Sequence, residues 1–229
     1  MSNGSYHQFC PVAMAAEVLC TRWTMVLVRE LVAGSTRFND LRRGVPRMSR
    51  SLLAQRLREL EAAGIVERRP VPGSQNVDYL LTAAGRDLFP VVEAFGLWGQ
   101  KWVRSNPSLE NLDVSLLMWD MRRNLDPSPL PARRTVLQFR FSDQPPAKRD
   151  WWLVVDPSGG TDLCLTDPGF EVDLFVTTDV RTMTAIWMGL TTVRAERERL
   201  DMEGCRETAS SIQHWLGLSP FASQEKLVS

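Results

Sequence analysis

The chain has 229 residues, 44% of them hydrophobic, and its 27 basic and 27 acidic residues give a net charge of zero. This length provides room for one large domain or for two ordinary domains, each with its own core. The sequence has no apolar run near the roughly 18 residues of a membrane span, no secretion signal and four irregularly spaced cysteines, which favours a cytoplasmic protein without disulfides.

Charge is distributed unevenly between the two halves of the chain. Residues 1–106 carry 14 basic and 9 acidic side chains, whereas residues 107–229 carry 13 and 18. The basic excess is densest in residues 36–69, which contain nine arginines and four acidic residues. A basic half and an acidic half indicate two modules with different partners. The alternative is that the arginines only solvate exposed helix faces. We expect one domain over 1–106, a helix and linker over 107–131, and a second domain over 132–229.

The first predicted elements are three helices. A helix over Pro11–Leu19 begins with proline, which is favoured at the first helical position. A second helix over residues 23–32 is preceded by Thr21 and followed by Gly34. A short third helix is predicted over residues 39–43.

A longer helix over residues 49–63 carries the strongest functional signal. Ser49 is a good N-cap, and Gly64 suits the left-handed position after the last turn. One face of this helix is apolar and carries Leu53, Leu57 and Leu60. The opposite face carries hydrogen-bonding and cationic groups, namely Ser51, Gln55 and Arg58. Joined to the preceding short helix by a tight turn, it predicts a helix-turn-helix whose second helix enters the major groove of DNA.

A β-hairpin is predicted directly after this helix-turn-helix. Strands over residues 65–69 and Val77–Leu81 flank a turn over residues 70–76 that is rich in proline and glycine. Such a hairpin, placed after the second helix, forms the wing of a winged helix-turn-helix.

A long helix over residues 83–103, capped by Thr82, is expected to follow the wing. Pro90 should kink this helix or split it at Phe89. The apolar stripe of the helix is too wide for a helix solvated on all sides, so it must cover the winged unit or a second subunit.

The candidate DNA contacts fall into three groups. Side chains near the start of the recognition helix are expected to contact bases, and these are Ser49, Arg50, Ser51 and Gln55. Glutamine can bond bidentately to adenine, and arginine to guanine. A set of arginines is expected to neutralise phosphates, namely Arg42, Arg43, Arg47, Arg58, Arg68 and Arg69, and Arg37 belongs to the same DNA-binding region. At the wing tip, Gln75 or Asn76 is expected to enter the minor groove. A dimer would place its recognition helices about 34 Å apart, so the operator should be an inverted repeat.

The first half resembles the HxlR-type winged helix-turn-helix regulators, relatives of the MarR group. The shared motifs occur in order over about residues 10–104, and they are the Cys-Pro start, RWT, RF-x-DL, LxxRLRELExxGIVxR and YxLTxxG. The resemblance implies a dimeric, cytoplasmic, prokaryotic transcription factor, more often a repressor, whose N-terminal and last helices build the dimer. Cys20 departs from the pattern, because a small residue such as glycine is more usual there, but no DNA-contacting position is affected.

Cys10 is a candidate redox sensor. Some HxlR-type regulators use a cysteine at this place to sense oxidants or electrophiles, as the resemblance implies. The peptide dipoles at a helix N-terminus favour a thiolate, which raises reactivity at neutral pH. The alternative is a buried or capping residue without a switch function.

The second half is predicted to fold as an α+β domain. After a helix over residues 114–123, the sequence contains strand-like runs over 134–141, 151–156, 161–166 and 172–177. Later elements are helices over 180–189 and 206–216, with a short strand over 199–203. Strands that precede helices, rather than alternating with them, favour an α+β layer arrangement.

Residues 131–222 resemble the sterol-carrier type of lipid-binding domain. The resemblance rests on WWLVV, LCLTDPG, EVDLFVTTD and the ending HWLGLSPFA. It implies a mixed sheet covered by helices, with an apolar cavity that could sense a small apolar effector. The candidate pocket residues are Trp119, Trp152, Phe175, Met183, Trp187 and Met188. The alternative is that these residues form ordinary core, because aromatic residues and methionine fill cores more often than they line pockets.

No sequence motif indicates catalysis. The chain lacks GxSxG, HExxH, GxGxxG and a phosphate-cradling glycine loop, so we expect no enzyme activity, no cofactor and no metal. The predicted function is that of an HxlR-type repressor, a homodimer on double-stranded DNA whose effector is sensed by the C-terminal domain or by Cys10. The alternative is a lipid or small-ligand carrier that uses its helical domain only to dimerise, and the arginine density of residues 36–69 argues against it.

Overall fold

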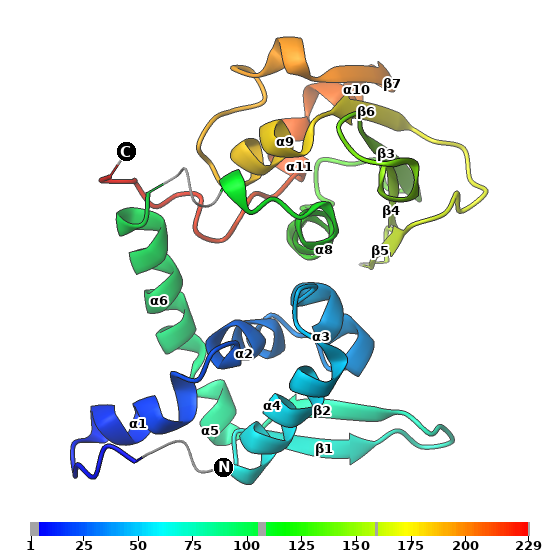
Figure 1. The fold of residues 1–229 in the computed structure, drawn as a ribbon. Coiled ribbons are helices and arrows are strands. Elements are labelled where there is room, and N and C mark those ends of the chain that lie inside the picture. Colours follow the sequence, from blue (N-terminus) through cyan, green and yellow to red (C-terminus); the bar gives the residue numbers. More distant parts are fainter. Residues whose placement is uncertain (1–4, 105–108, 159, 229) are drawn as a thin grey trace. The chain divides into compact units, whose positions relative to one another are not determined.

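The computed structural model describes residues 5–104, 109–158 and 160–228. The chain divides into two compact units, Met1–Gly96 and Leu97–Ser229 (Figure 1). The fold is α+β: helices dominate the first unit, and a five-stranded sheet with helices forms the second. Each unit has its own hydrophobic core, as the length of the chain allows.

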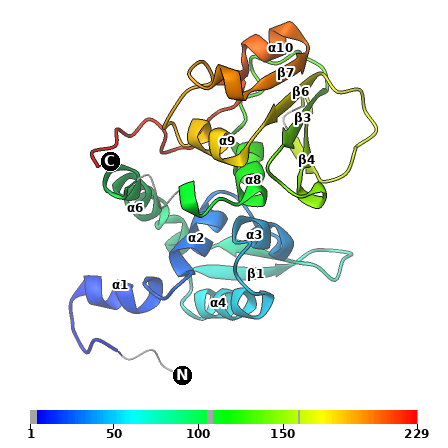
Figure 2. The ribbon, with the colours of Figure 1, turned by 45° about the horizontal axis from the view of Figure 1, so that its top comes forward.

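The first unit contains the predicted helix-turn-helix and wing. Its elements in chain order are α1 (Pro11–Leu19), α2 (Thr24–Val32), α3 (Phe38–Gly44), α4 (Arg50–Ala62), β1 (Val66–Pro70), β2 (Val77–Leu81), α5 (Ala83–Arg86) and α6 (Phe89–Trp102), which runs on past the unit boundary. The α3–turn–α4 pair and the antiparallel hairpin β1–β2 confirm the expected order of elements. Figure 2 shows β1 and α4 beside each other, where α4 leads directly into the wing.

Two helix boundaries in this unit differ by one or two residues from the prediction, although the predicted split of the helix over 83–103 is present. The expected helix over residues 83–103 is broken at residues 87 and 88 rather than at Phe89. Pro90 lies in the first turn of α6, where a missing N–H costs nothing, so the proline helps to start the second helix instead of kinking a continuous one. Trp23 lies outside α2, because its φ of 79° is left-handed and places it just before the first helical residue.

The core of the first unit is built by one face of each helix. As predicted, α4 buries its leucines, with Leu53, Leu57 and Leu60 at most 2% exposed. They pack with Leu27 and Leu31 of α2 and with other apolar residues of α3 and the wing. Gly64 follows α4 with φ +71°, the left-handed conformation expected of it. The burial of this leucine face determines which face of α4 remains exposed.

The second unit is built on a mixed sheet in the order β5-β4-β3-β6-β7. Its elements are α8 (Val114–Asn124), β3 (Thr135–Phe141), the 3-10 turn η1 (Pro146–Lys148), β4 (Asp150–Val155), β5 (Thr161–Cys164), β6 (Leu174–Thr178), α9 (Val180–Trp187), the 3-10 turn η2 (Arg197–Arg199), β7 (Asp201–Gly204), α10 (Arg206–Ser210) and α11 (Ile212–Trp215). The central strands β3 and β6 are parallel, and the remaining neighbours are antiparallel.

One predicted helix of this unit is also split. Residues 206–216 form α10 and α11 rather than one helix, with Ser211 between them. The hydroxyl groups of Ser210 and Ser211 both donate to the carbonyl of Glu207, at 2.9 and 3.0 Å. Serine hydroxyls that bond to nearby backbone carbonyls compete with helical geometry, which accounts for the break.

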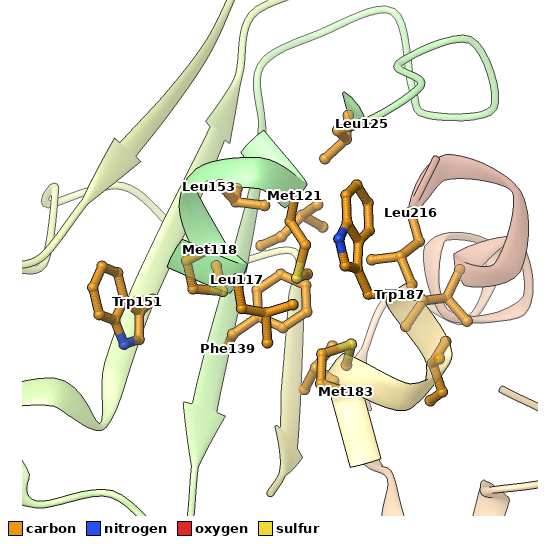
Figure 3. Close-up of a cluster of buried hydrophobic side chains, with 14 of the residues drawn as sticks. Leu117, Met118, Met121, Leu125, Phe139, Trp151, Leu153, Met183, Trp187 and Leu216 are labelled. Carbon is orange, nitrogen blue, oxygen red and sulfur yellow. The ribbon is translucent and has the colours of Figure 1, made fainter. Parts of the chain in front are cut away.

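One face of the sheet carries the core of the second unit. Phe139 and Leu153 on the strands pack against Met118 and Met121 of α8 and Met183 of α9 (Figure 3). Thus α8, which lies in the segment expected to be a helix and linker, contributes to this core. Trp215 of α11 completes it, with its ring edge-on to Phe139 at 6.3 Å between centroids.

The candidate ligand-pocket residues are distributed over both faces of this sheet. Met183 and Trp187 lie in the packed core, and Met188 packs against its edge. Trp119 and Trp152 are buried as well. Phe175 is half-exposed on the opposite face, where it lines a cavity of about 270 Å³.

Candidate nucleic-acid interface

The start of α4 is fixed by a side-chain cap. The Ser49 hydroxyl accepts a hydrogen bond from the N–H of Leu52 at 3.2 Å, and it lies 3.1 Å from the hydroxyl of Ser51. Both serines and the neighbouring Arg50 are exposed. Because the Ser49 oxygen accepts the capping bond and one of the two hydroxyl groups donates to the other, one hydroxyl hydrogen and the Arg50 guanidinium are the donors that this end of the helix can offer to DNA.

Gln55 has a partner on its own helix that the sequence analysis did not identify. Its Nε2 donates a hydrogen bond to Oε1 of Glu59 at 2.9 Å, and Glu59 also forms an ion pair with Arg56. Partial burial acts to raise the pKa of Glu59, but the hydrogen bonds from Gln55 and Arg56 outweigh it and lower that pKa. The carboxylate therefore remains charged and restricts the orientation of the Gln55 amide. The i,i+4 spacing of glutamine and glutamate was the available sequence signal.

Arg56 differs from the other arginines of this region. Its side chain is mostly buried, and its Nε donates to the carbonyl of Arg22 at 3.3 Å. The contact links α4 to the turn before α2. Arg56 therefore acts in positioning the helix rather than as an exposed cation.

The predicted phosphate-binding arginines fall into two classes. Within residues 5–104, three of the candidates form ion pairs: Arg37 with Asp78, Arg43 with Asp40 and Arg69 with Glu67. Four of the predicted DNA-contacting arginines, Arg42, Arg50, Arg58 and Arg68, form no ion pair with a carboxylate in the described part of the first unit. Exposed ion pairs contribute only about 0–1 kcal/mol, so a paired arginine can exchange its carboxylate for a phosphate.

The wing is attached to the segment before α3. The backbone N–H of Tyr79 donates to the carbonyl of Thr36 at 2.8 Å, and Arg37 forms a β-bridge with Asp78. At the tip, Gly73 adopts φ +72°, and the N–H of Val71 donates to the carbonyl of Asn76 at 3.0 Å. These bonds attach the segment before α3 to the half of β2 nearest the turn and close the turn itself.

A groove between α3 and the wing brings together four predicted site residues. It has a volume of about 490 Å³, and its lining includes Arg37, Arg43, Gln75 and Asn76. The sequence places the two arginines more than thirty residues from the wing tip. Only the hairpin, which folds back along α3, makes them neighbours.

Comparison with known proteins identifies this architecture. The model of the HxlR-like helix-turn-helix family matches residues 18–107. The regulator YvaP of Bacillus subtilis, an uncharacterized HTH-type transcriptional regulator, is 33% identical over 98 residues, which cover 42% of this chain and 91% of YvaP. The chain belongs to the HxlR-like helix-turn-helix family. It is a DNA-binding transcriptional regulator.

Other relatives match the same part of this HxlR-like chain. YybR of Bacillus subtilis, named as an uncharacterized HTH-type transcriptional regulator, is 39% identical over 94 residues, covering 40% of this chain and 74% of YybR. The solved structure of the redox regulator HypR in its reduced form is 37% identical, covers 40% of this chain and 91% of HypR, and gives a TM-score of 0.38. The family match ends at residue 107, and the likeness of the second unit to sterol-carrier domains stays a prediction.

The HxlR-like unit leaves apolar surface uncovered on its first and last helices. On and before α1, Phe9 is 99% exposed and Val12 is 76% exposed. On α6, Phe95 and Trp98 are more than half exposed. Phe95 and Trp98 lie three positions apart on one side of α6 and form an exposed apolar stripe. Protein interfaces commonly bury stripes of this kind.

Cys10 is the N-cap of α1. Hydrogen bonds from the backbone N–H groups of Ala13 and, to a lesser extent, Val12 lower the pKa of its thiol, and only slight desolvation opposes them. The thiol is partly exposed. The position of Cys10 at a helix N-terminus agrees with the sequence analysis, and its redox role stays a prediction.

The described residues contain neither a cluster of metal-ligating side chains nor a single helix of membrane-spanning character. Within residues 5–104, 109–158 and 160–228, no three His, Cys, Asp or Glu side chains are grouped so that they could hold a metal ion. Across the same ranges, no individual helix has the length and apolar character of a bilayer span; α1 and α2 satisfy that criterion only jointly, with an 85° bend between them.

Proposed function

We propose that this HxlR-like regulator is a cytoplasmic repressor that binds an inverted-repeat operator as a homodimer, without a cofactor. The observation that carries the proposal is the two-faced character of α4. Its leucine face is buried in the core, and its other face presents Ser51, Gln55 and Arg58 to solvent. A helix held in this way offers hydrogen-bonding groups to base edges in a major groove.

The arginines supply the binding energy that does not depend on base sequence. Arg42, Arg58 and Arg68 form no ion pair with a carboxylate in the described first unit, and each phosphate they neutralise releases counterions from the duplex. Arg43, Arg47 and Arg69 join this set. Arg50, at the start of the recognition helix, is assigned to base contacts. Gln75 or Asn76 at the wing tip reaches the minor groove, and Arg37 lies beside this end of the wing.

The homodimer rests on the exposed apolar faces of α1 and α6. Phe9, Phe95 and Trp98 would lose their exposure in a symmetric interface, where burial of aromatic area is the main source of stability. Two recognition helices related by a twofold axis then read two half-sites in opposite directions. This geometry is the reason for expecting an inverted repeat.

Regulation would act through a second site. One candidate is Cys10, whose lowered pKa favours reaction with oxidants or electrophiles. The other is the second unit, as the binding site of a small apolar effector. In either case the ligand or modification must favour one arrangement of the recognition helices over another.

The test is a selection of bound fragments from the genome of the source organism, followed by fluorescence anisotropy with the recovered duplex. We expect an inverted repeat, bound with at least a hundredfold preference over random DNA at physiological salt. Light scattering should give the mass of two chains for the free protein and the mass of two chains plus one duplex for the complex. A monomer on DNA, or equal affinity for every duplex, would contradict the proposal.

A further inference from the structure

The second unit contains a cavity distinct from the surfaces described above. It has a volume of about 740 Å³ and lies between β7, the helices α10 and α11, and the segment over residues 192–197. Figures 1 and 2 show β7 and α10 side by side at one edge of the sheet. Sites for small organic ligands commonly enclose about 300–1,000 Å³.

The inner wall of this cavity is apolar. Val193 and Ile212 belong to the hydrophobic core and are 7% and 2% exposed, and Met202 and Ala209 pack against the same core from its edge. The cavity is therefore an opening into the margin of the core. An apolar ligand group placed against these aliphatic side chains would remove apolar surface from water, which is favourable.

The rim of the cavity is cationic. Three arginines line it, namely Arg194, Arg197 and Arg206. Arg197 is held in place by a hydrogen bond from its Nη1 to the carbonyl of Leu200 at 3.0 Å. In the described part of the second unit, none of the three forms an ion pair with a carboxylate.

The lining contains no acidic residue to balance these cations. The acidic residues of β7 lie at alternate positions, and successive side chains of a strand point to opposite faces. Met202 and Gly204 line this cavity, whereas Asp201 and Glu203 line the cavity of about 270 Å³ that also contains Phe175. The alternation therefore separates the carboxylates of β7 from the three guanidinium groups.

We propose that this cavity binds a small amphipathic anion, with a carboxylate at the arginine rim and an aliphatic or aromatic body against the Val193–Ile212 wall. Guanidinium groups bind carboxylates through paired, charge-assisted hydrogen bonds. An apolar wall disfavours a nucleic-acid backbone, which has no apolar group to place there. The role of such a ligand as the effector rests on the proposed function, but its binding to the second unit does not.

The direct test is calorimetric titration of the full chain with decanoate and with decanol, which share an aliphatic body and differ in charge. We expect one decanoate per chain and at least tenfold weaker binding of decanol. Equal affinity for the two compounds would show that the arginines play no part and would overturn the proposal.

Variants separate the rim from the cavity itself. Arg194→Gln combined with Arg206→Gln should weaken decanoate binding at least tenfold, and Ser210→Trp should block the cavity without any change of charge. Lys148→Gln removes one exposed cation that does not line the cavity, and it should leave decanoate affinity unchanged. Wild-type affinity in both cavity variants, at unchanged thermal stability, would contradict the site, as would an equal loss in Lys148→Gln.

Operator binding is measured separately, so that the two proposals can fail independently. The double arginine variant without ligand should bind operator DNA with wild-type affinity. A loss of operator affinity in that variant would mean that these arginines contact DNA, and the proposal would be wrong. Absence of specific DNA binding by the wild type, with decanoate binding intact, would contradict only the proposed function.

Discussion

The Gln55 amide donates a hydrogen bond to the Glu59 carboxylate at 2.9 Å, one turn further along α4. This bond engages one of the two amide hydrogens and leaves the second hydrogen and the carbonyl oxygen available. Those two groups are what a bidentate contact with adenine requires. Glu59 therefore restricts the orientation of Gln55 without occupying the two groups that the proposed base contact requires.

The first prediction concerns this pair. Gln55→Ala should weaken operator binding by about 1–3 kcal/mol and relax the preference at one base pair, because a bidentate base contact is lost. Glu59→Gln should retain most of the affinity but broaden the preference, because the amide of Gln55 is no longer held by a charge. Anisotropy titrations with single-base operator variants measure both effects. Equal weakening of operator and random DNA by Gln55→Ala would remove this residue from base recognition.

The second prediction concerns the phosphate contacts. Arg43→Ala should weaken binding to all duplexes and lower the slope of log affinity against log salt concentration by about 1, because one fewer counterion is released. Arg68→Ala, which removes an unpaired cation on β1, should behave in the same way. Arg104→Ala removes an exposed cation outside the helix-turn-helix and wing and serves as the control. A slope that stays unchanged in Arg43→Ala would mean that Arg43 does not neutralise a phosphate.

The third prediction concerns Gly44, the last residue of α3. A Cβ at Gly44 would lie 1.9 Å from Cδ of the fully buried Glu30, which forms an ion pair with Arg29. Arg29 also donates to the carbonyl of Gly44 at 3.1 Å, so Gly44→Ala cannot be accommodated without disturbing that pair. We expect a loss of about 1–3 kcal/mol in the free energy of unfolding of the first unit.

Gly99→Ala is the matched control for Gly44→Ala. Gly99 lies within α6, and a Cβ there meets no atom within 4 Å. This substitution should stabilise the chain by roughly 0.5–1 kcal/mol. Urea denaturation of both variants, followed by fluorescence, measures the difference. Equal stability of the two variants would show that Glu30 can move away at little cost.

The fourth prediction concerns the dimer. Trp98→Asp should give a monomer in light scattering and reduce operator affinity at least tenfold, because a charge replaces a buried aromatic side chain in the interface. Glu93→Gln changes an exposed residue of the same helix and should remain dimeric. A wild-type molecular mass in Trp98→Asp would place the interface elsewhere.

The fifth prediction concerns Cys10. Backbone N–H groups lower the pKa of its thiol, so the thiolate forms at a lower pH than in a free cysteine, and the reactive fraction grows as pH rises through that lowered pKa. In a variant that carries Cys20→Ser, Cys164→Ser and Cys205→Ser, only Cys10 can react with iodoacetamide. The rate of this reaction should reach half its maximum at a lower pH than the rate for free cysteine. If Cys10→Ser leaves operator release by diamide unchanged, Cys10 is not the switch.

The sequence predicted those features of the chain that depend on near neighbours. Ser49 and Gly64 delimit α4 because capping and left-handed geometry are local properties. The leucine spacing of α4 correctly gave its buried face, and therefore the exposed face proposed to read DNA. Helix boundaries were predicted less accurately where one residue type is compatible with two structures. Pro90 is an example, because proline is tolerated at the start of a helix and disruptive inside one.

The site depends on pairings that sequence spacing does not reveal. Arg37 is paired with Asp78, and Arg56 with the carbonyl of Arg22, across separations of 41 and 34 residues. The charge count of residues 36–69 treats all nine arginines alike. In the folded chain, Arg56 is mostly buried and positions α4. Other arginines form ion pairs with carboxylates, and a third set is exposed without an ion pair.

By itself, the sequence determined the order of the elements, the buried face of the recognition helix and the basic character of the first half, because periodicity, capping and composition act over a few residues. The tertiary structure decided which cations remain unpaired, how Arg43 comes to lie beside Gln75 and Asn76, and where Arg194, Arg197 and Arg206 surround an apolar cavity. Those relationships arise when strands and helices distant in the chain pack together. Packing determines which charged side chains form ion pairs and which remain exposed to solvent.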